Sequence, residues 1–203
     1  MGLTGVAPLR GEGIVEGWLQ GARRCESPNC NERPERRDIS LLVIHNISLP
    51  PGVYGSGCVQ AFFCNRLDCD SHPAFDEIRD LQVSAHVLIE RDGALTQFVS
   101  FEDRAWHAGI SCFEGRENCN DFSIGIELEG CDTEAYTDAQ YHRLAMVTGD
   151  IMQAYPAITR ERIVGHSDIA PGRKSDPGPA FDWPFYQALL AGLHGDRSDG
   201  DPV

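Results

Sequence analysis

The sequence predicts an α/β or α+β fold in which a single mixed central β-sheet is flanked by helices. Residues 40–45 form a continuous apolar run, which is typical of a strand buried on both faces. A strand-like pair surrounds a turn at 91–93, and two amphipathic helical patterns begin near 137 and 182. Strands mixed with helices in this way favour one sheet with helices on its faces.

Length and composition indicate one acidic globular domain. A chain of 203 residues is the size of a single domain, which we expect to span 14–193, with flexible termini at 1–13 and 194–203. The net charge of −14 argues against nucleic acid and anionic membrane surfaces as partners. We find no run of the ~18 apolar residues that a membrane span needs, and no secretory signal. We therefore expect a cytoplasmic protein. We also expect a monomer, although these features do not determine the oligomeric state.

The eight cysteines do not form a metal-binding pattern that we recognise. Three of them, Cys58, Cys64 and Cys69, are separated by five and four residues rather than by the two that are typical of structural zinc sites. In a reducing cytosol they are expected to remain thiols.

Local patterns assign most elements along the chain. One short helical face is predicted from Ile14, Trp18, Leu19 and Ala22, and a second helix around 59–63. Residues 83–89 and 94–99 read as a hairpin around the turn at 91–93. Thr137 and Gln140 form a capping box that opens a helix ending before Pro156, and Asp182 can cap a last helix.

Residues 122–130 alternate cleanly and are the most informative strand. Ile124, Ile126 and Leu128 take one face, while Gly125, Glu127 and Glu129 take the other. A glycine beside two carboxylates on a sheet face suggests a cleft. The alternative is the solvated polar face of an edge strand, and the pattern alone does not choose between them.

Residues 163–183 offer His166, Lys174 and Asp176 on what reads as a loop shaped by several prolines and glycines. Because residues i and i+2 of an extended chain point the same way, Lys174 and Asp176 are expected to face one site. A catalytic zinc usually takes three protein ligands, so a further ligand must come from elsewhere. His45, at the end of the buried strand, is a candidate, although alone it could be a hydrogen-bonded core histidine.

Two imidazoles and a carboxylate would make a three-ligand zinc shell with an open fourth position. Glu127 fits the role of proton acceptor, and Lys174 fits that of a cation that stabilises a developing oxyanion. We interpret His86 as a residue that hydrogen-bonds within the sheet. Direct roles for His107 and Glu129 are less favoured than structural ones.

Five ordered motifs within residues 14–190 resemble the type 2 N-acetylmuramoyl-L-alanine amidases, which share a fold with peptidoglycan recognition proteins. The motifs are LLVIHNISLPPG, VSAHVLIERDG, RAWHAG, CNDFSIGIELEG and GHSDIAPGRKSDPGPAFDW.

The resemblance implies zinc (Zn²⁺) held by His45, His166 and Asp176, with Glu127 and Lys174 as catalytic residues. It implies hydrolysis of the amide between the muramyl lactyl group and L-alanine, on soluble 1,6-anhydro-muramyl peptides recycled in the cytosol. The resemblance also implies that Asn46, Trp106 and Arg173 line the substrate groove.

The chain also departs from these relatives. Ala85 stands where phage-type members carry a catalytic tyrosine, which leaves proton transfer to Glu127. Asp176 replaces their cysteine ligand. Gln82 and Asn118 stand where close relatives carry arginines that hold carboxylates of the stem peptide.

Two other functions remain open at this point. The protein could be an amidase that cuts intact peptidoglycan outside the cytoplasm, or a binding module that recognises muramyl peptides without cutting them. Non-catalytic relatives typically lack a zinc ligand, whereas this chain keeps all three candidates.

Overall fold

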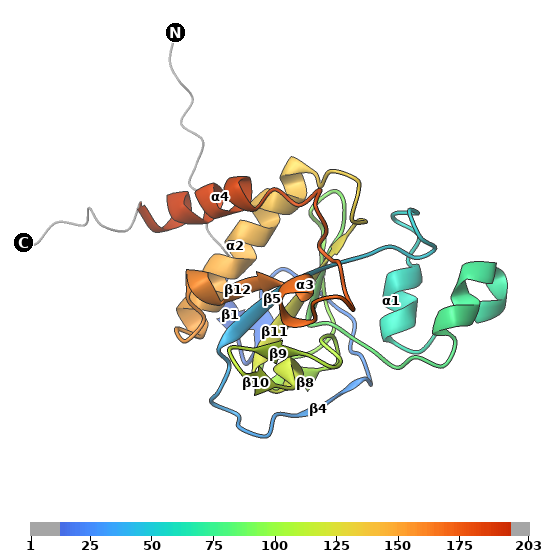
Figure 1. Cartoon of the computed structure of the whole chain (residues 1–203), viewed down its shortest axis with the longest axis horizontal. Coiled ribbons are helices and arrows are strands. Elements are labelled where there is room, and N and C mark those ends of the chain that lie inside the picture. Colours follow the sequence, from blue (N-terminus) through green and yellow to red (C-terminus); the bar gives the residue numbers. More distant parts are fainter. Residues whose placement is uncertain (1–12, 196–203) are drawn as a thin grey trace, which may run out of the picture.

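The fold was obtained as a computed structural model that describes residues 13–195 (Figure 1). The predicted flexible ends lie almost wholly outside these residues, so the proposed domain limits stay a prediction. Within the described range no helix is both long and apolar enough to cross a membrane.

A six-stranded mixed sheet forms the centre of the molecule, as predicted. Its first four strands are mutually parallel, and the fifth runs antiparallel to the fourth. In spatial order the strands are β12 (Ile163–Gly165), β5 (Leu41–Ile47), β11 (Ser123–Glu129), β6 (Val87–Ile89), β7 (Leu95–Gln97) and β3 (Arg23–Arg24). The predicted hairpin is therefore β6 and β7, each shorter than the pattern indicated.

Two long helices cover one face of this sheet (Figure 1). These are α2 (Asp138–Ala154) and α4 (Trp183–Gly195), which also pack against each other. Alternate residues of the central strands, such as Leu42 and Ile44 of β5 and Ile126 of β11, contribute to the core beneath them. Because side chains alternate across a strand, His45 and Glu127 must lie on the opposite face.

That opposite face is covered by short elements rather than by long helices. Leu41 and Val43 pack there against Ala108, Phe122 and Ile169. The covering elements are α3 (His166–Ile169), the hairpin of β9 (Cys112–Phe113) and β10 (Arg116–Glu117), and the turn η3 (Cys119–Asp121). Loops and single turns leave room for polar side chains above the sheet, which a packed helix layer would exclude.

A lobe extends from one side of the sheet, at the right in Figure 1. It contains α1 (Cys58–Phe63), η1 (Cys69–Ser71) and η2 (Pro73–Ile78). Phe63 on α1 packs edge-on against Phe98, and Phe75 is buried in the same cluster. The remaining short elements are the pair β1 (Ile14–Val15) and β2 (Trp18–Leu19), the pair β4 (Cys30–Glu32) and β8 (Asp103–Ala105), and η4 (Arg160–Arg162).

Two expectations about strands and helices were wrong. The predicted helical face at residues 14–22 is the hairpin of β1 and β2, because Glu16 and Gly17 adopt positive φ values of 51° and 77° and turn the chain. The edge-strand interpretation of 122–130 also fails, since β11 lies between β5 and β6 and is buried throughout.

The capping box of α2 provides a first testable prediction. Thr137 Oγ1 accepts a hydrogen bond from the Gln140 amide at 3.1 Å, and Gln140 Oε1 accepts one from the Thr137 amide at 3.1 Å. Thr137→Ala removes the first bond, so we expect urea titration to show a free energy of unfolding lower by about 1 kcal/mol. Thr133→Ala, at an exposed position, is the control and should change it by less than about 0.5 kcal/mol.

Candidate metal centre

Three ligand-type atoms converge at the carboxyl end of β5. His45 Nδ1 lies 3.0 Å from His166 Nδ1 and 3.0 Å from Asp176 Oδ2, and His166 Nδ1 lies 3.1 Å from the same oxygen. Within the described residues, this is the group of His, Cys, Asp and Glu side chains that could hold a metal ion. The structure thus brings together three residues separated by up to 131 positions in the sequence.

Local structure explains how each of the three reaches this point. His45 lies within β5, and β12 runs parallel beside that strand with Gly165 opposite Ile44, so His166 follows at the same edge of the sheet. His166 is the first residue of the short helix α3, rather than part of a loop as predicted. The loop after α3 returns to the helix start, where the Ser167 amide donates to the Asp176 carbonyl at 3.0 Å.

The hydrogen bond on the outer nitrogen of His166, Nε2, indicates that its Nδ1 can act as a metal ligand. Its Nε2 lies 3.1 Å from the carbonyl oxygen of Ala108, which can only accept a hydrogen bond. Nε2 therefore carries the proton, and in a neutral imidazole Nδ1 then presents a lone pair to the cluster. His166 Nδ1 and the carboxylate of Asp176 therefore both direct lone pairs toward the centre of the cluster.

Electrostatics keep His45 neutral and Asp176 charged. Burial lowers the pKa of His45 to about 4, although the hydrogen bond with Asp176 opposes this. Burial alone would raise the pKa of Asp176, but hydrogen bonding with His166 and His45 brings it below its usual range. A neutral imidazole and an ionised carboxylate are the ligand forms that metal ions require.

This donor set fits a zinc ion. Bonds of about 2.0–2.1 Å at tetrahedral angles separate neighbouring ligand atoms by roughly 3.3 Å, close to the spacing observed here. Two nitrogens and one carboxylate oxygen are also a known ligand set of catalytic zinc sites, which keep the fourth position open. A cation would satisfy all three atoms at once, which mutual hydrogen bonds do not.

Glu127 lies directly beside this cluster. In the parallel pairing of β5 and β11 it is the register partner of His45, and both side chains are on the face opposite α2. Glu127 is only 8% exposed, and its Oε2 has no hydrogen-bond partner among the described residues. Burial raises its pKa well above the usual value, and the charge of Asp176 adds to this. Such a carboxyl group is suited to proton transfer.

Lys174 is exposed on the loop between α3 and Asp176, and its positive charge acts on both Glu127 and His45. This is consistent with the expectation that Lys174 and Asp176 face the same site. The ammonium opposes the rise in the pKa of Glu127.

The three predicted groove residues lie around the cluster, held by the loops there. The amide of Asn46 donates to Asp132 Oδ1 at 2.8 Å and to the Pro177 carbonyl at 3.1 Å. Arg173 Nη2 donates to the Ala108 carbonyl at 2.7 Å. Trp106 is half-buried. Whether these residues contact a substrate stays a prediction.

Two structural interpretations of polar residues are confirmed. His86 Nδ1 accepts a hydrogen bond from the Gly125 amide at 3.0 Å, within the sheet as predicted. Glu129 holds neighbouring loops, because its carboxylate accepts from the amides of Gly55 at 2.6 Å and Arg91 at 3.3 Å. His107 is not one of the three converging residues, as expected, but its Nδ1 lies 2.9 Å from His45 Nε2, on the outer side of that ring.

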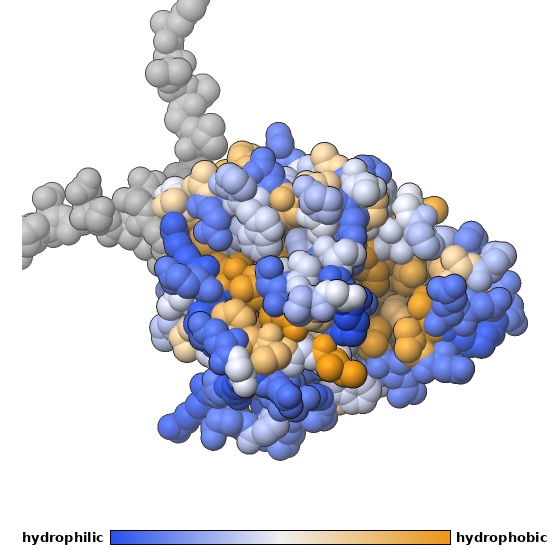
Figure 2. Space-filling model, in the orientation of Figure 1, coloured by the Kyte–Doolittle hydropathy of each residue, from blue (hydrophilic) through white to orange (hydrophobic). Residues whose placement is uncertain are grey.

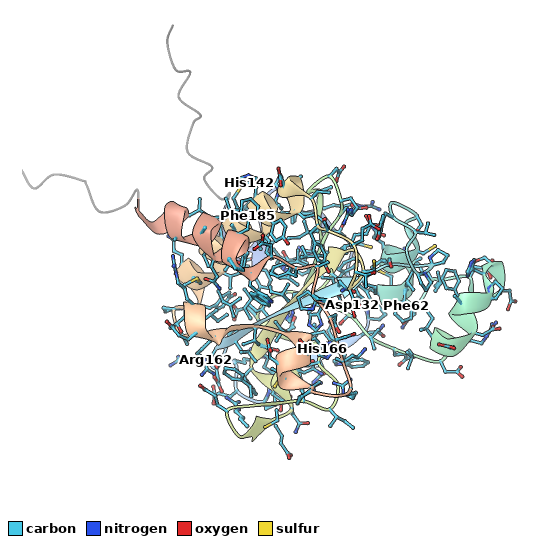
Figure 3. The ribbon with its side chains drawn as sticks, turned by 45° about the horizontal axis from the view of Figure 1, so that its top comes forward. Phe62, Asp132, His142, Arg162, His166 and Phe185 are labelled. Atoms are coloured by element: carbon cyan, nitrogen blue, oxygen red, sulfur yellow. The ribbon has the colours of Figure 1, made fainter. Side chains whose placement is uncertain are left out.

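Figures 2 and 3 show the part of the molecule in which this centre lies. Figure 3 shows His166 and Asp132 near the middle of the molecule, with Phe62 of α1 farther toward the lobe. Figure 2 shows recessed hydrophobic residues between that central region and the hydrophilic lobe.

Comparisons with known proteins indicate the family of the chain. Residues 35–179 match the model of the family described as N-acetylmuramoyl-L-alanine amidase. A 1,6-anhydro-N-acetylmuramyl-L-alanine amidase AmpD from Salmonella typhimurium is 58% identical over 176 residues, which cover 87% of this chain and 94% of that protein.

Solved structures give the same result. A crystal structure of a selenomethionine derivative of AmpD superposes with a TM-score of 0.85 at 56% identity, covering 87% of this chain and 98% of that one. The Escherichia coli amidase AmiD, in complex with the substrate anhydro-N-acetylmuramic acid-L-Ala-D-γ-Glu-L-Lys, superposes with a TM-score of 0.56 at 31% identity, covering 85% of this chain and 60% of that one. The predicted fold class is confirmed.

Proposed function

The chain belongs to the N-acetylmuramoyl-L-alanine amidase family, and we propose that it is a zinc enzyme of peptidoglycan recycling. Its proposed reaction is hydrolysis of the amide between the lactyl group of 1,6-anhydro-N-acetylmuramic acid and the L-alanine of the stem peptide. The observation that carries this proposal is the convergence of His45, His166 and Asp176 beside the unpartnered carboxyl oxygen of Glu127.

Each residue then has a distinct task. His45, His166 and Asp176 would hold the zinc, which when bound would polarise the scissile carbonyl and lower the pKa of a water molecule. Glu127 would accept the proton of the attacking water and pass it to the departing nitrogen of L-alanine. Lys174 would stabilise the negative charge that develops on the carbonyl oxygen.

The residues around the centre would bind the rest of the substrate. We propose that Trp106, whose indole N–H donates to Asn31 Oδ1 at 2.7 Å, offers its ring to the sugar. Asn46 and Arg173, fixed by the contacts described above, would line the groove beside the peptide. The AmiD complex with an anhydro-muramyl tripeptide supports this substrate class.

Chelation tests the zinc dependence. Treatment of the purified protein with a chelator should abolish release of stem peptide from an anhydro-muramyl tripeptide, measured by mass spectrometry, and one equivalent of zinc should restore it. Activity that survives complete removal of the metal would contradict the proposal. Zinc bound at one equivalent with no product from any muramyl peptide would instead indicate a binding module.

Substrate choice is tested by the same assay. We expect faster release from the soluble anhydro-muramyl tripeptide than from its non-anhydro counterpart or from insoluble sacculi. Preference for sacculi would indicate an enzyme that cuts intact peptidoglycan.

We also propose that the protein acts as a monomer in the cytoplasm. All residues of the proposed centre come from one chain. The eight cysteines are free thiols, the state that the reducing cytosol maintains. Light scattering on the purified protein and fractionation of the source cells would test the two statements separately.

A further inference from the structure

The outer sides of both ligand histidines are contacted by two consecutive residues of one loop. After β8, the side chain of His107 meets His45 Nε2 at 2.9 Å, and the carbonyl of Ala108 accepts from His166 Nε2 at 3.1 Å. The loop backbone is itself fixed, because Asn120 Oδ1 accepts from the amides of His107 at 3.0 Å and Ala108 at 2.7 Å. One short segment thus orients two imidazoles at once.

From this arrangement we propose that His107 is a positioning residue for the metal centre, accepting a hydrogen bond from His45 and so fixing the ring and tautomer of that ligand. The inference rests on the proposed zinc site. The Nδ1 atom of His107 faces the outer nitrogen of His45 and not the three converging atoms. His107 therefore acts through His45 and is not itself a ligand.

The hydrogen-bond directions are consistent along the whole chain of contacts. If His45 presents the lone pair of Nδ1 to the ion, its Nε2 must carry the proton and donate to His107 Nδ1. His107 then carries its own proton on Nε2, which lies 3.2 Å from Ser123 Oγ and can donate to it. Imidazole ligands of metals usually have such an outer acceptor, which fixes the ring and raises its basicity.

The sheet beneath His107 is shaped to receive its ring. Gly125 of β11 lies under it, and a Cβ atom at that position would come within 2.5 Å of His107 Cγ and Nδ1. The two flanking residues on this face are Ser123, which contacts His107, and Glu127. The glycine in the alternating pattern of β11 therefore makes room for the ring that orients His45.

Zinc affinity is the readout that tests the proposal. His107→Leu keeps similar bulk but has no acceptor, and we expect competition with a chromophoric chelator to show zinc affinity lower by about 10–100-fold. His107→Asn places an amide oxygen near the position of Nδ1 and should recover most of that loss. His142→Leu, at an exposed histidine, is the matched control and should bind zinc like the wild type.

The outcomes separate this inference from the proposed function. Wild-type affinity in His107→Leu, or equal weakness in the Leu and Asn variants, would overturn the positioning role while leaving the zinc site intact. A wild-type protein that binds no zinc would overturn both.

A measurement on the wild type tests the proposal even if the variants fail to fold. Nitrogen-15 NMR of the zinc-loaded protein should show His45 protonated at Nε2, and His107 protonated at Nε2 but not at Nδ1. The reverse tautomer of His107 would exclude it as the acceptor and overturn the proposal.

Discussion

Replacing Glu127 with Gln is expected to lower kcat by roughly 10²–10⁴-fold while zinc stays bound at one equivalent, because this is the usual contribution of a general base. The amide has nearly the same shape as the carboxyl group but cannot accept a proton. Glu127 lies beside His45, but its Oε2 forms no hydrogen bond with the proposed metal ligands. The substitution should therefore leave the positions of the three ligand atoms unchanged. The loss should therefore fall on kcat, with a smaller change in KM.

Glu129→Gln is the matched control for this experiment. Glu129 lies two residues along the same strand and on the same face, but its carboxylate already accepts from the amides of Gly55 and Arg91. The same chemical change there alters a loop contact and should reduce kcat by less than about tenfold. If Glu127→Gln kept near wild-type turnover, or if both variants lost activity equally, Glu127 would not be the proton acceptor.

Much of the fold was predictable because its signals are local. The apolar run at 40–45 and the capping box at Thr137 depend only on neighbouring residues, and both elements form as predicted. The hairpin at residues 14–19 was missed because Ile14, Trp18 and Leu19 happen to match helical spacing. Gly17 was the better signal, since a Cβ there would collide with Ser100.

The position of β11 was harder to predict for a physical reason. Alternating Ile and polar residues usually mark a half-exposed strand, yet both faces of β11 are buried. Its polar face is covered in part by the loop that carries His107, whose ring lies over Gly125 and contacts Ser123. Such a cover leaves no periodic pattern in the sequence, because the contacting residues come from distant, irregular segments.

The candidate site was predictable in its residue types and not in its geometry. Residue chemistry and the family resemblance point to His45, His166 and Asp176. The distance of about 3 Å between the two histidine Nδ1 atoms depends on β5 and β12 being neighbours, which neither of those signals gives. The same topology makes Glu127 the register partner of His45. The contact of His107 with His45 involves a loop residue, for which spacing in the sequence gives no signal.

Replacing Asp176 with Asn is expected to weaken zinc binding by more than about 100-fold, because even the loss of an outer partner of a ligand costs 10–100-fold. Asp176 Oδ2 is the anionic member of the cluster, within about 3 Å of both ligand nitrogens. The neutral amide removes the negative charge that attracts the cation, while the Asp176 carbonyl still accepts from Ser167 and keeps the loop in place. Hydrolysis should fall with zinc occupancy and recover partly at high zinc concentration.

Asp168→Asn makes the same chemical change eight residues earlier and provides the control. Asp168 Oδ2 accepts from the Gly165 amide at 2.7 Å at the start of α3, a role that an asparagine oxygen can also perform. Zinc titration should therefore separate the two variants sharply, although they differ from the wild type by the same loss of charge. Equal zinc affinity in both variants would show that Asp176 is not a ligand. The proposed zinc site would then have only two protein ligands, His45 and His166, instead of the three that a catalytic zinc usually takes.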